Sequence, residues 1–221
     1  MQNQIKDEDI VSLLELQDKI RKKYLVEDLL GNNIKILLIL ESPHTDEIRY
    51  KYPVAGDTGI EISKYLLDEV NEPIGKYIKE HLDNSIYGIM NCCQIPMQES
   101  PYCSNFQKKE IFDAFKTIRK TEEDVEKRNN ENTKFVDNQI CNDLKRRLLS
   151  IIKKSEIQLI VPCGNMANYF INKCSNIIGE IEIYKDIPHP AYNNWSRKND
   201  DIEKLRKNID EIINRDNNAN N

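Results

Sequence analysis

The strongest constraint on the fold is a set of short, almost purely apolar segments separated by longer amphipathic ones. The clearest are residues 34–40 (IKILLIL) and 157–163 (IQLIVPC). They are too short to be buried helices, and runs of this kind are typical of strands that are covered on both faces of a sheet. Residues 85–91 and 180–186 are two further strand candidates.

Amphipathic segments lie between the predicted strands. Apolar residues recur at helical spacing in six segments: 8–30, 60–70, 108–120, 138–155, 164–174 and 202–213. Strands that alternate with helices favour an α/β domain with a mainly parallel sheet. We therefore predict a three-layer α/β/α fold with a central four-stranded sheet.

The predicted domain spans residues 31–213. A helical segment, 1–30, precedes it, because the Gly-Asn-Asn turn at 31–33 interrupts the apolar periodicity. Residues 121–138 are strongly polar and predict a solvated excursion from the domain. The Asn-rich tail, 214–221, is typical of a disordered chain end.

Composition narrows the functional classes. Charged residues make up 31% and hydrophobic residues 39% of the 221 residues, as in a globular protein. No apolar run approaches the roughly 20 residues that cross a bilayer, and the polar start differs from a signal peptide, so we expect a cytoplasmic protein without a membrane partner. The formal net charge of −5 argues against strong nonspecific binding to nucleic acid but allows a local basic face. The six cysteines form no CxxC pair, so no disulfide framework is predicted.

Three polar segments directly follow predicted strands. They are 40-LESPHTDEIRYKYPVAGDTG-59, 91-NCCQIP-96 and 189-HPAYNNW-195. Ligands of parallel α/β sheets bind beyond the carboxyl ends of the strands. The sequence therefore predicts that these segments meet at one edge of the sheet and form the functional site.

The same segments resemble motifs of the uracil-DNA glycosylase superfamily. The first motif of the branch that carries GEAPG matches without a gap at Glu41, Pro43, Glu47, Pro53, Gly56 and Gly59. NCCQIP resembles the strand end that supplies a base-reading asparagine, and VPCGNMA (161–167) resembles the family's strand–Gly–helix element. HPAYNNW resembles the second catalytic motif, usually His-Pro-Ser before a DNA-inserting loop. The resemblance covers about residues 34–195 in the family's order.

The resemblance implies a monofunctional DNA glycosylase that leaves an abasic site, with DNA as partner. Glu41 would orient water and stabilise the cationic sugar, and His189 would polarise the base carbonyl. Glu47 is a second candidate carboxylate, or only fixes the loop through hydrogen bonds. Asn91 would read the edge of a flipped pyrimidine, and His44 would contact the base or a phosphate.

Further residues would contact the DNA backbone or the base stack. Gly56 and Gly59 allow close approach of backbone N–H groups to a phosphate. Tyr192, Asn193 and Trp195 would form a wedge for the gap that a flipped base leaves.

Four residues depart from the family pattern: Leu40, His44, Val54 and Ala191. Val54 replaces the aromatic residue that stacks on the base, so the predicted substrate is uracil or a bulkier modified pyrimidine, such as a phage-type modified cytosine. Tyr50 or Tyr52 is the alternative source of the stacking ring. The cysteine pair of the iron–sulfur members is absent, so we expect no metal and no cofactor. Repair and antiviral defence are both compatible with this activity.

Each of these residues also has an ordinary structural interpretation, as a loop cap, a turn residue or part of the core. The basic segment around 145–147 is compatible with a solvated helix face or with DNA tracking. Two alternative functions remain. One is a catalytically weak nucleic-acid or base-binding module of the same fold, which Val54 and Ala191 favour. The other is a nucleoside or nucleotide hydrolase, which the low basicity favours.

Overall fold

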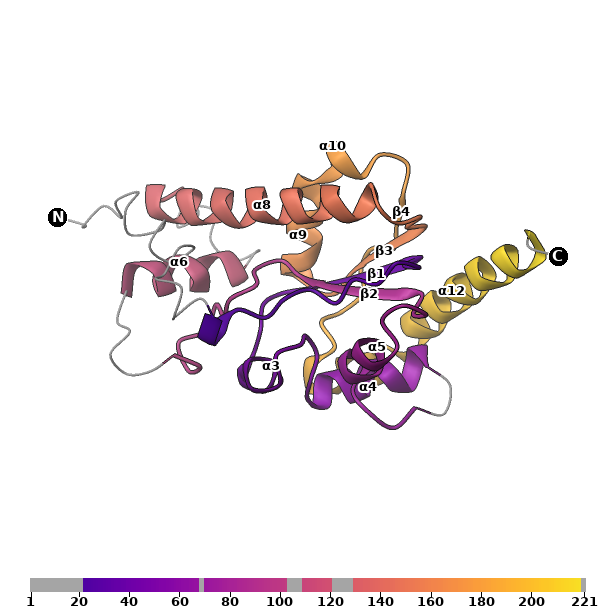
Figure 1. Cartoon of the computed structure of the whole chain (residues 1–221). Helices are drawn as coiled ribbons and strands as arrows, with labels where there is room; N and C mark the ends of the chain where they lie inside the picture. The colour runs from indigo at the N-terminus through magenta and orange to yellow at the C-terminus, as the bar shows by residue number, and fades with distance from the viewer. Residues whose placement is uncertain (1–21, 68–69, 103–108, 121–128, 220–221) are drawn as a thin grey trace.

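The computed structural model describes residues 22–67, 70–102, 109–120 and 129–219 (Figure 1). Its centre is a four-stranded sheet in the order β2-β1-β3-β4, and all three strand pairings are parallel. The strands are β1 (Ile36–Leu40), β2 (Tyr87–Asn91), β3 (Leu159–Pro162) and β4 (Glu182–Ile183). All four lie within the predicted strand segments, so the predicted fold class is confirmed.

Helices cover both faces of the sheet, which makes three layers (Figure 1). One face packs against α6 (Lys109–Arg119), α8 (Glu131–Ile152), α9 (Asn165–Lys173) and α10 (Ser175–Ile178). The other face packs against α4 (Asp57–Leu66), α5 (Ile74–Glu80) and α12 (Asn199–Ala219). The short helix α3 (Thr45–Tyr50) follows β1 directly.

The two-sided cover explains the almost purely apolar strands. Every residue of β1 is buried. Leu37 and Ile39 pack in the core beneath α6, α8 and α9, whereas Leu38 and Leu40 pack in the core beneath α4, α5 and α12. Because every residue of β1, β2 and β3 is buried, polar side chains in these three strands are confined to the strand ends.

The first two turns of α8 correct the predicted polar excursion at 121–138. The helix begins at Glu131, where the side chain of the N-cap residue Asn130 accepts a hydrogen bond of 2.9 Å from the Asn132 N–H. Val136 lies in the core on the inner side of these turns, so the polar residues occupy the outer face of an amphipathic helix. Residues 121–128 of the predicted excursion lie outside the described residues.

The ends of the chain also differ from the predictions. Most of the predicted helix 8–30 lies outside the described residues; 22–24 is helical, but 25–30 is not, and Leu29 forms an antiparallel bridge with Ile89 at the edge of the sheet. The predicted disordered tail, 214–221, was wrong up to Ala219. Residues 214–219 form the last turns of α12, whose buried apolar residues begin at Ile202. No helix among the described residues is both long and apolar enough to span a bilayer.

Candidate functional site

The register of β1 and β2 places two predicted site residues side by side. Leu40 pairs with Asn91, so Glu41 emerges from the sheet beside the Asn91 strand end. The two chains stay paired beyond the strands, because the N–H groups of Cys92 and Cys93 donate to the carbonyl oxygens of Leu40 (2.8 Å) and Glu41 (3.1 Å). Glu41 and Asn91 therefore share the carboxyl edge of the sheet, as predicted.

His189 reaches the same edge from the other side of β1. Cys163, just after β3, forms a parallel bridge with Ile187, and the Gly164 N–H donates to the Ile187 carbonyl at 2.8 Å. Gly164 has a φ of 95°, and a Cβ on it would lie 2.9 Å from the His189 Cβ. A glycine is thus required here twice, for its backbone conformation and for the close approach of the histidine loop.

The His189 ring has a defined hydrogen-bonding state. The Ala191 N–H donates to Nδ1 at 3.2 Å, so the proton of the neutral ring is on Nε2. Burial lowers the pKa of His189. The negative charge of Glu41 raises this pKa, and the positive charge of Arg119 lowers it further. The neutral ring with its proton on Nε2 is therefore the dominant form at neutral pH, and an N–H at Nε2 suits donation to a carbonyl oxygen.

Glu41 has a partner that the sequence did not reveal. Oε1 of Glu41 forms an ion pair with Nε of Arg119, at the last residue of α6. The two residues are 78 positions apart. Arg119 is the last residue of an amphipathic helix, and no spacing pattern connects it to the motif of Glu41.

Asn91 has a buried side chain without a hydrogen-bond partner. Only 2% of the residue is exposed, and neither Nδ2 nor Oδ1 has a partner at hydrogen-bond geometry among the described residues, although the amide lies close enough to the Glu47 carboxylate to lower the pKa of that group. The buried hydroxyl of Ser42, next to Glu41, is also unpaired. An unmet buried amide costs about 1–3 kcal/mol, and such a group is a candidate for bonding a ligand.

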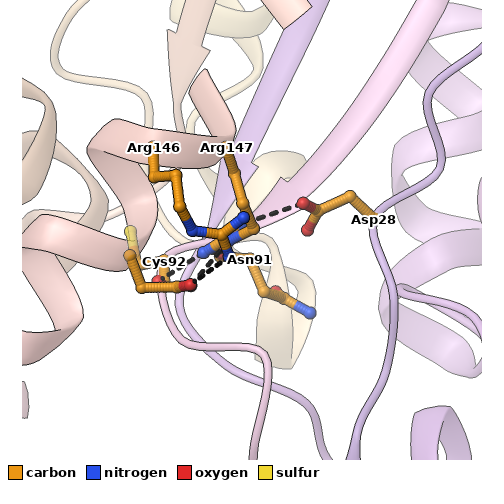
Figure 2. A network of polar contacts seen from close by, with 6 residues as sticks. Asp28, Asn91, Cys92, Arg146 and Arg147 are labelled. Atoms are coloured by element: carbon orange, nitrogen blue, oxygen red, sulfur yellow. Dashed lines mark hydrogen bonds and ion pairs between the residues drawn. The ribbon is translucent and has the colours of Figure 1, made fainter. Parts of the chain in front are cut away.

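The backbone of Asn91 is held from behind by Arg147 (Figure 2). One guanidinium nitrogen donates to the carbonyl oxygens of Asn91 (3.0 Å) and Cys92 (2.9 Å), while the others bond Asp28 (2.8 Å) and Asp143 (2.7 Å). Burial opposes the positive charge, but the two carboxylates raise the pKa of Arg147 overall. Arg147 therefore belongs to the interior, and it does not track DNA.

Glu47 fixes the loop between β1 and α4. Its Oε2 accepts the His44 N–H at 2.6 Å and its Oε1 accepts the Val54 N–H at 2.8 Å. Burial raises its pKa to about 7; the two N–H bonds and the nearby Asn91 amide oppose this rise. Both carboxylate oxygens are thus engaged, which supports the loop-fixing interpretation over a catalytic one.

Stability is expected to fall as pH rises through the pKa of Glu47. The folded state holds this proton more tightly than the unfolded chain, so the stabilisation is complete below pH 4.5 and is lost above about pH 7. At about 1.4 kcal/mol per pKa unit, the rise corresponds to about 3 kcal/mol. The free energy of unfolding, measured with urea at pH 4.5 and at pH 8, should fall between the two pH values in the wild-type protein. In Glu47→Gln this fall should be smaller by about 3 kcal/mol. An unchanged dependence, matching the exposed control Glu80→Gln, would contradict the assignment.

Val54 adopts a conformation that is rare for a β-branched residue. It is buried and has a φ of 49°, in the left-handed region that favours glycine. Its carbonyl oxygen lies 1.9 Å from where a Cβ on Gly59 would be, so Gly59 is required for this packing. The Gly59 N–H donates to the Gly56 carbonyl at 2.8 Å. This corrects the predicted phosphate contact of Gly59, whereas that of Gly56, at the start of α4, stays a prediction.

The prediction that Trp195 inserts into DNA was wrong. The residue is fully buried, its Nε1–H donates to the Pro188 carbonyl at 2.9 Å, and its ring packs edge-on against Tyr65. It belongs to α11 (Asn194–Arg197), which Glu61 anchors by accepting bonds from the N–H and hydroxyl of Ser196 (2.9 and 2.7 Å). These contacts make Trp195 the support of the loop.

Tyr192 and Asn193 stand at the exposed tip of that loop. Tyr192 is 87% exposed, and both residues have positive φ values, 60° and 55°. They lie in the turn η1 (Ala191–Asn193), directly after the His189-Pro190 pair. An exposed aromatic side chain held in a strained turn is suited to contact with a partner.

The remaining predicted contacts are at the rim. His44 is exposed, with Nε2 2.9 Å from Oε1 of Gln98. Of the two alternative stacking rings, Tyr52 is buried, with the Lys79 ammonium 4.9 Å from its centroid, whereas Tyr50 is about half exposed. Which ring would stack on a base stays a prediction.

The cysteines near the site are not arranged as metal ligands. Among the described residues, no group of three His, Cys, Asp or Glu side chains could hold a metal ion. Cys92 and Cys93 are buried, and burial raises the pKa of Cys93 to about 12, so its thiol keeps its proton. Cys103 lies outside the described residues.

No protein-family model matches this sequence, and no curated protein is significantly similar to it. The resemblance to uracil-DNA glycosylases therefore stays a prediction from the motifs.

Proposed function

We propose that the protein is a monofunctional DNA glycosylase that hydrolyses the N-glycosidic bond of a flipped pyrimidine nucleotide. The observation that carries this proposal is the buried, unpaired amide of Asn91 at the strand end next to Glu41. An amide offers two donors and one acceptor, which can pair with the edge of a pyrimidine. The unmet hydrogen bonds would be supplied by the flipped base, and this would offset part of the cost of unstacking it.

The proposed reaction divides the work between two sides of the nucleotide. Glu41 orients a water molecule and stabilises positive charge on the sugar. The water oxygen forms a bond to C1′ as the C1′–N1 bond breaks, and the bonding electrons leave with the base. The Nε2–H of His189 donates to the base carbonyl oxygen, where negative charge develops. A proton from the water restores the neutral base, so no metal or other cofactor is needed.

Two features of the rim support DNA as the substrate. Tyr192 is exposed directly after His189, where a ring can fill the gap left by the flipped base. Asn193, the next residue, offers polar side-chain atoms that can contact the sugar–phosphate backbone of the DNA. The supporting contacts of Trp195 and Glu61 hold this loop against α4. We place the activity in the cytoplasm.

The small side chain of Val54 favours a modified pyrimidine as the substrate. A valine occupies less space than the aromatic residue at the equivalent position of the resembling family, so it would leave room for a substituted base. Its strained backbone is held by the Glu47 bond, which fixes the position of this small side chain. Uracil and substituted cytosines are therefore the substrates to test first.

The test is a panel of labelled single- and double-stranded oligonucleotides. They contain uracil, hypoxanthine, hydroxymethylcytosine or glucosylated cytosine, and alkali then cleaves any abasic site. Asn91→Leu, which keeps the side-chain volume, should lose base release while retaining the fold. Binding of DNA without release of any base would favour the alternative of a base-binding module. Hydrolysis of free nucleosides only would favour the nucleoside hydrolase.

A further inference from the structure

We propose that Arg119 is a positioning residue of this site. By pairing with Glu41 it holds the carboxylate at the strand end and offsets its negative charge, so that the nearby His189 ring stays neutral with its proton on Nε2. The inference deepens the proposed function, on which it rests for the role of His189. It concerns a residue that no motif of the sequence includes.

The first step of the argument is the ion pair. Arg119 and Glu41 come from different layers, the end of α6 and the segment after β1, and their contact joins the helix to the sheet edge. Both side chains are largely shielded, with 32% and 18% of their surface exposed. Charges in such a setting are screened less than exposed ones, so each affects its neighbours more strongly.

The second step is the requirement at His189. The Ala191 N–H donates to Nδ1, and this bond exists only while Nδ1 carries no proton. Protonation of the ring would break it and release the turn that follows. An unopposed carboxylate close by would favour that protonation. Offsetting the charge of Glu41 therefore favours the neutral ring, in the same direction as burial.

The third step is that Arg119 is the cation placed to do this. Among the described residues, the charged groups that act on the His189 ring are Glu41, which raises its pKa, and Arg119, which lowers it, both less than burial does. The hydrogen bonds of His189 and its close approach to Gly164 involve uncharged groups: the Ala191 N–H donates to the ring, and the Asn194 amide donates to the His189 carbonyl at 3.1 Å. Loss of Arg119 would leave only burial to oppose the effect of Glu41 on the His189 pKa.

The protonation of His189 can be measured directly by NMR, without any substrate. The chain has only three histidines, so their signals are few and can be assigned. Protein labelled with ¹⁵N-histidine is titrated by NMR, and the His189 signals are assigned with His189→Gln. In Arg119→Met, the midpoint of His189 should rise by about half a unit or more. Arg119→Lys should keep most of the wild-type value, and Glu41→Gln combined with Arg119→Met should restore a low midpoint. His81, which stacks on Tyr77, serves as an internal control.

The outcomes separate this inference from the proposed function. An unchanged His189 midpoint in a folded Arg119→Met protein, or a wild-type ring protonated on Nδ1, would overturn the inference even if base release is observed. A raised midpoint would support it even if no oligonucleotide is cleaved, which would overturn only the glycosylase. With an active substrate, Arg119→Met should also move the acidic limb of the kcat/KM profile to higher pH.

Discussion

Replacement of Glu41 by glutamine is expected to lower base release at least 100-fold, with little change in DNA binding. General acid–base groups typically contribute about 10²–10⁴-fold to a rate. Glutamine keeps the size of the side chain, and its amide oxygen can still accept a hydrogen bond from Arg119. Only the negative charge and the basicity of the carboxylate are lost. The rate should therefore fall while the fold is preserved.

The measurement is single-turnover release of the base on the best oligonucleotide of the panel, together with the dissociation constant. Glu80→Gln, on the exposed side of α5, is the matched control and should leave both unchanged. A Glu41→Gln enzyme with normal turnover would contradict the assignment. Loss of activity in Glu47→Gln alone, without a loss of stability, would move the catalytic role to Glu47.

Replacement of Arg147 by methionine is expected to destabilise the fold by about 3–5 kcal/mol. Methionine fills a similar length but leaves the buried carboxylate of Asp28 without its partner, and such a loss typically has this size. The carbonyl oxygens of Asn91 and Cys92 would also lose their donor. The end of β2 should loosen as a result, and the Asn91 amide with it.

Urea unfolding measures this effect, and the neighbouring residue offers a close control. Arg146 is 70% exposed and pairs with the same Asp143, so Arg146→Met should cost less than about 1 kcal/mol. A small effect of Arg147→Met would show that the buried network of Figure 2 contributes little net stability. In that case, exchange of Asp28 and Arg147 together for apolar residues should be close to neutral.

Much of the fold could be predicted from the sequence because burial on two faces leaves a local pattern. The residues of β1 are all apolar since each one faces one of two cores, and the short runs around β2 and β3 follow the same rule. The polar residues at the strand ends could be assigned to one edge, because parallel strands end on the same side. The resemblance to glycosylase motifs then singled out Glu41, Asn91 and His189 within these strand-end segments.

The predictions failed where a segment has no buried pattern of its own. Residues 25–30 look helical in isolation, yet they are not helical, and Leu29 among them bridges to Ile89 of β2. The polar residues 131–138 look like a loop, but one face of them packs on the core. The role of Trp195 could not be assigned from the sequence for a similar reason. An aromatic residue in a polar loop is compatible both with insertion into DNA and with support of the loop.

By itself, the sequence determined the four strands, several of the longer helices and the edge that carries the site, and its motifs supplied the candidate residues there. Each of these follows from periodicity or from residues that are close in the chain. Only the tertiary structure decided the partners: Arg119 for Glu41, Arg147 behind Asn91, and Gly164 against His189. These contacts join residues 25 to 78 positions apart. Short-range patterns carry no signal for such pairs, because the distance is closed only when helices and strands pack.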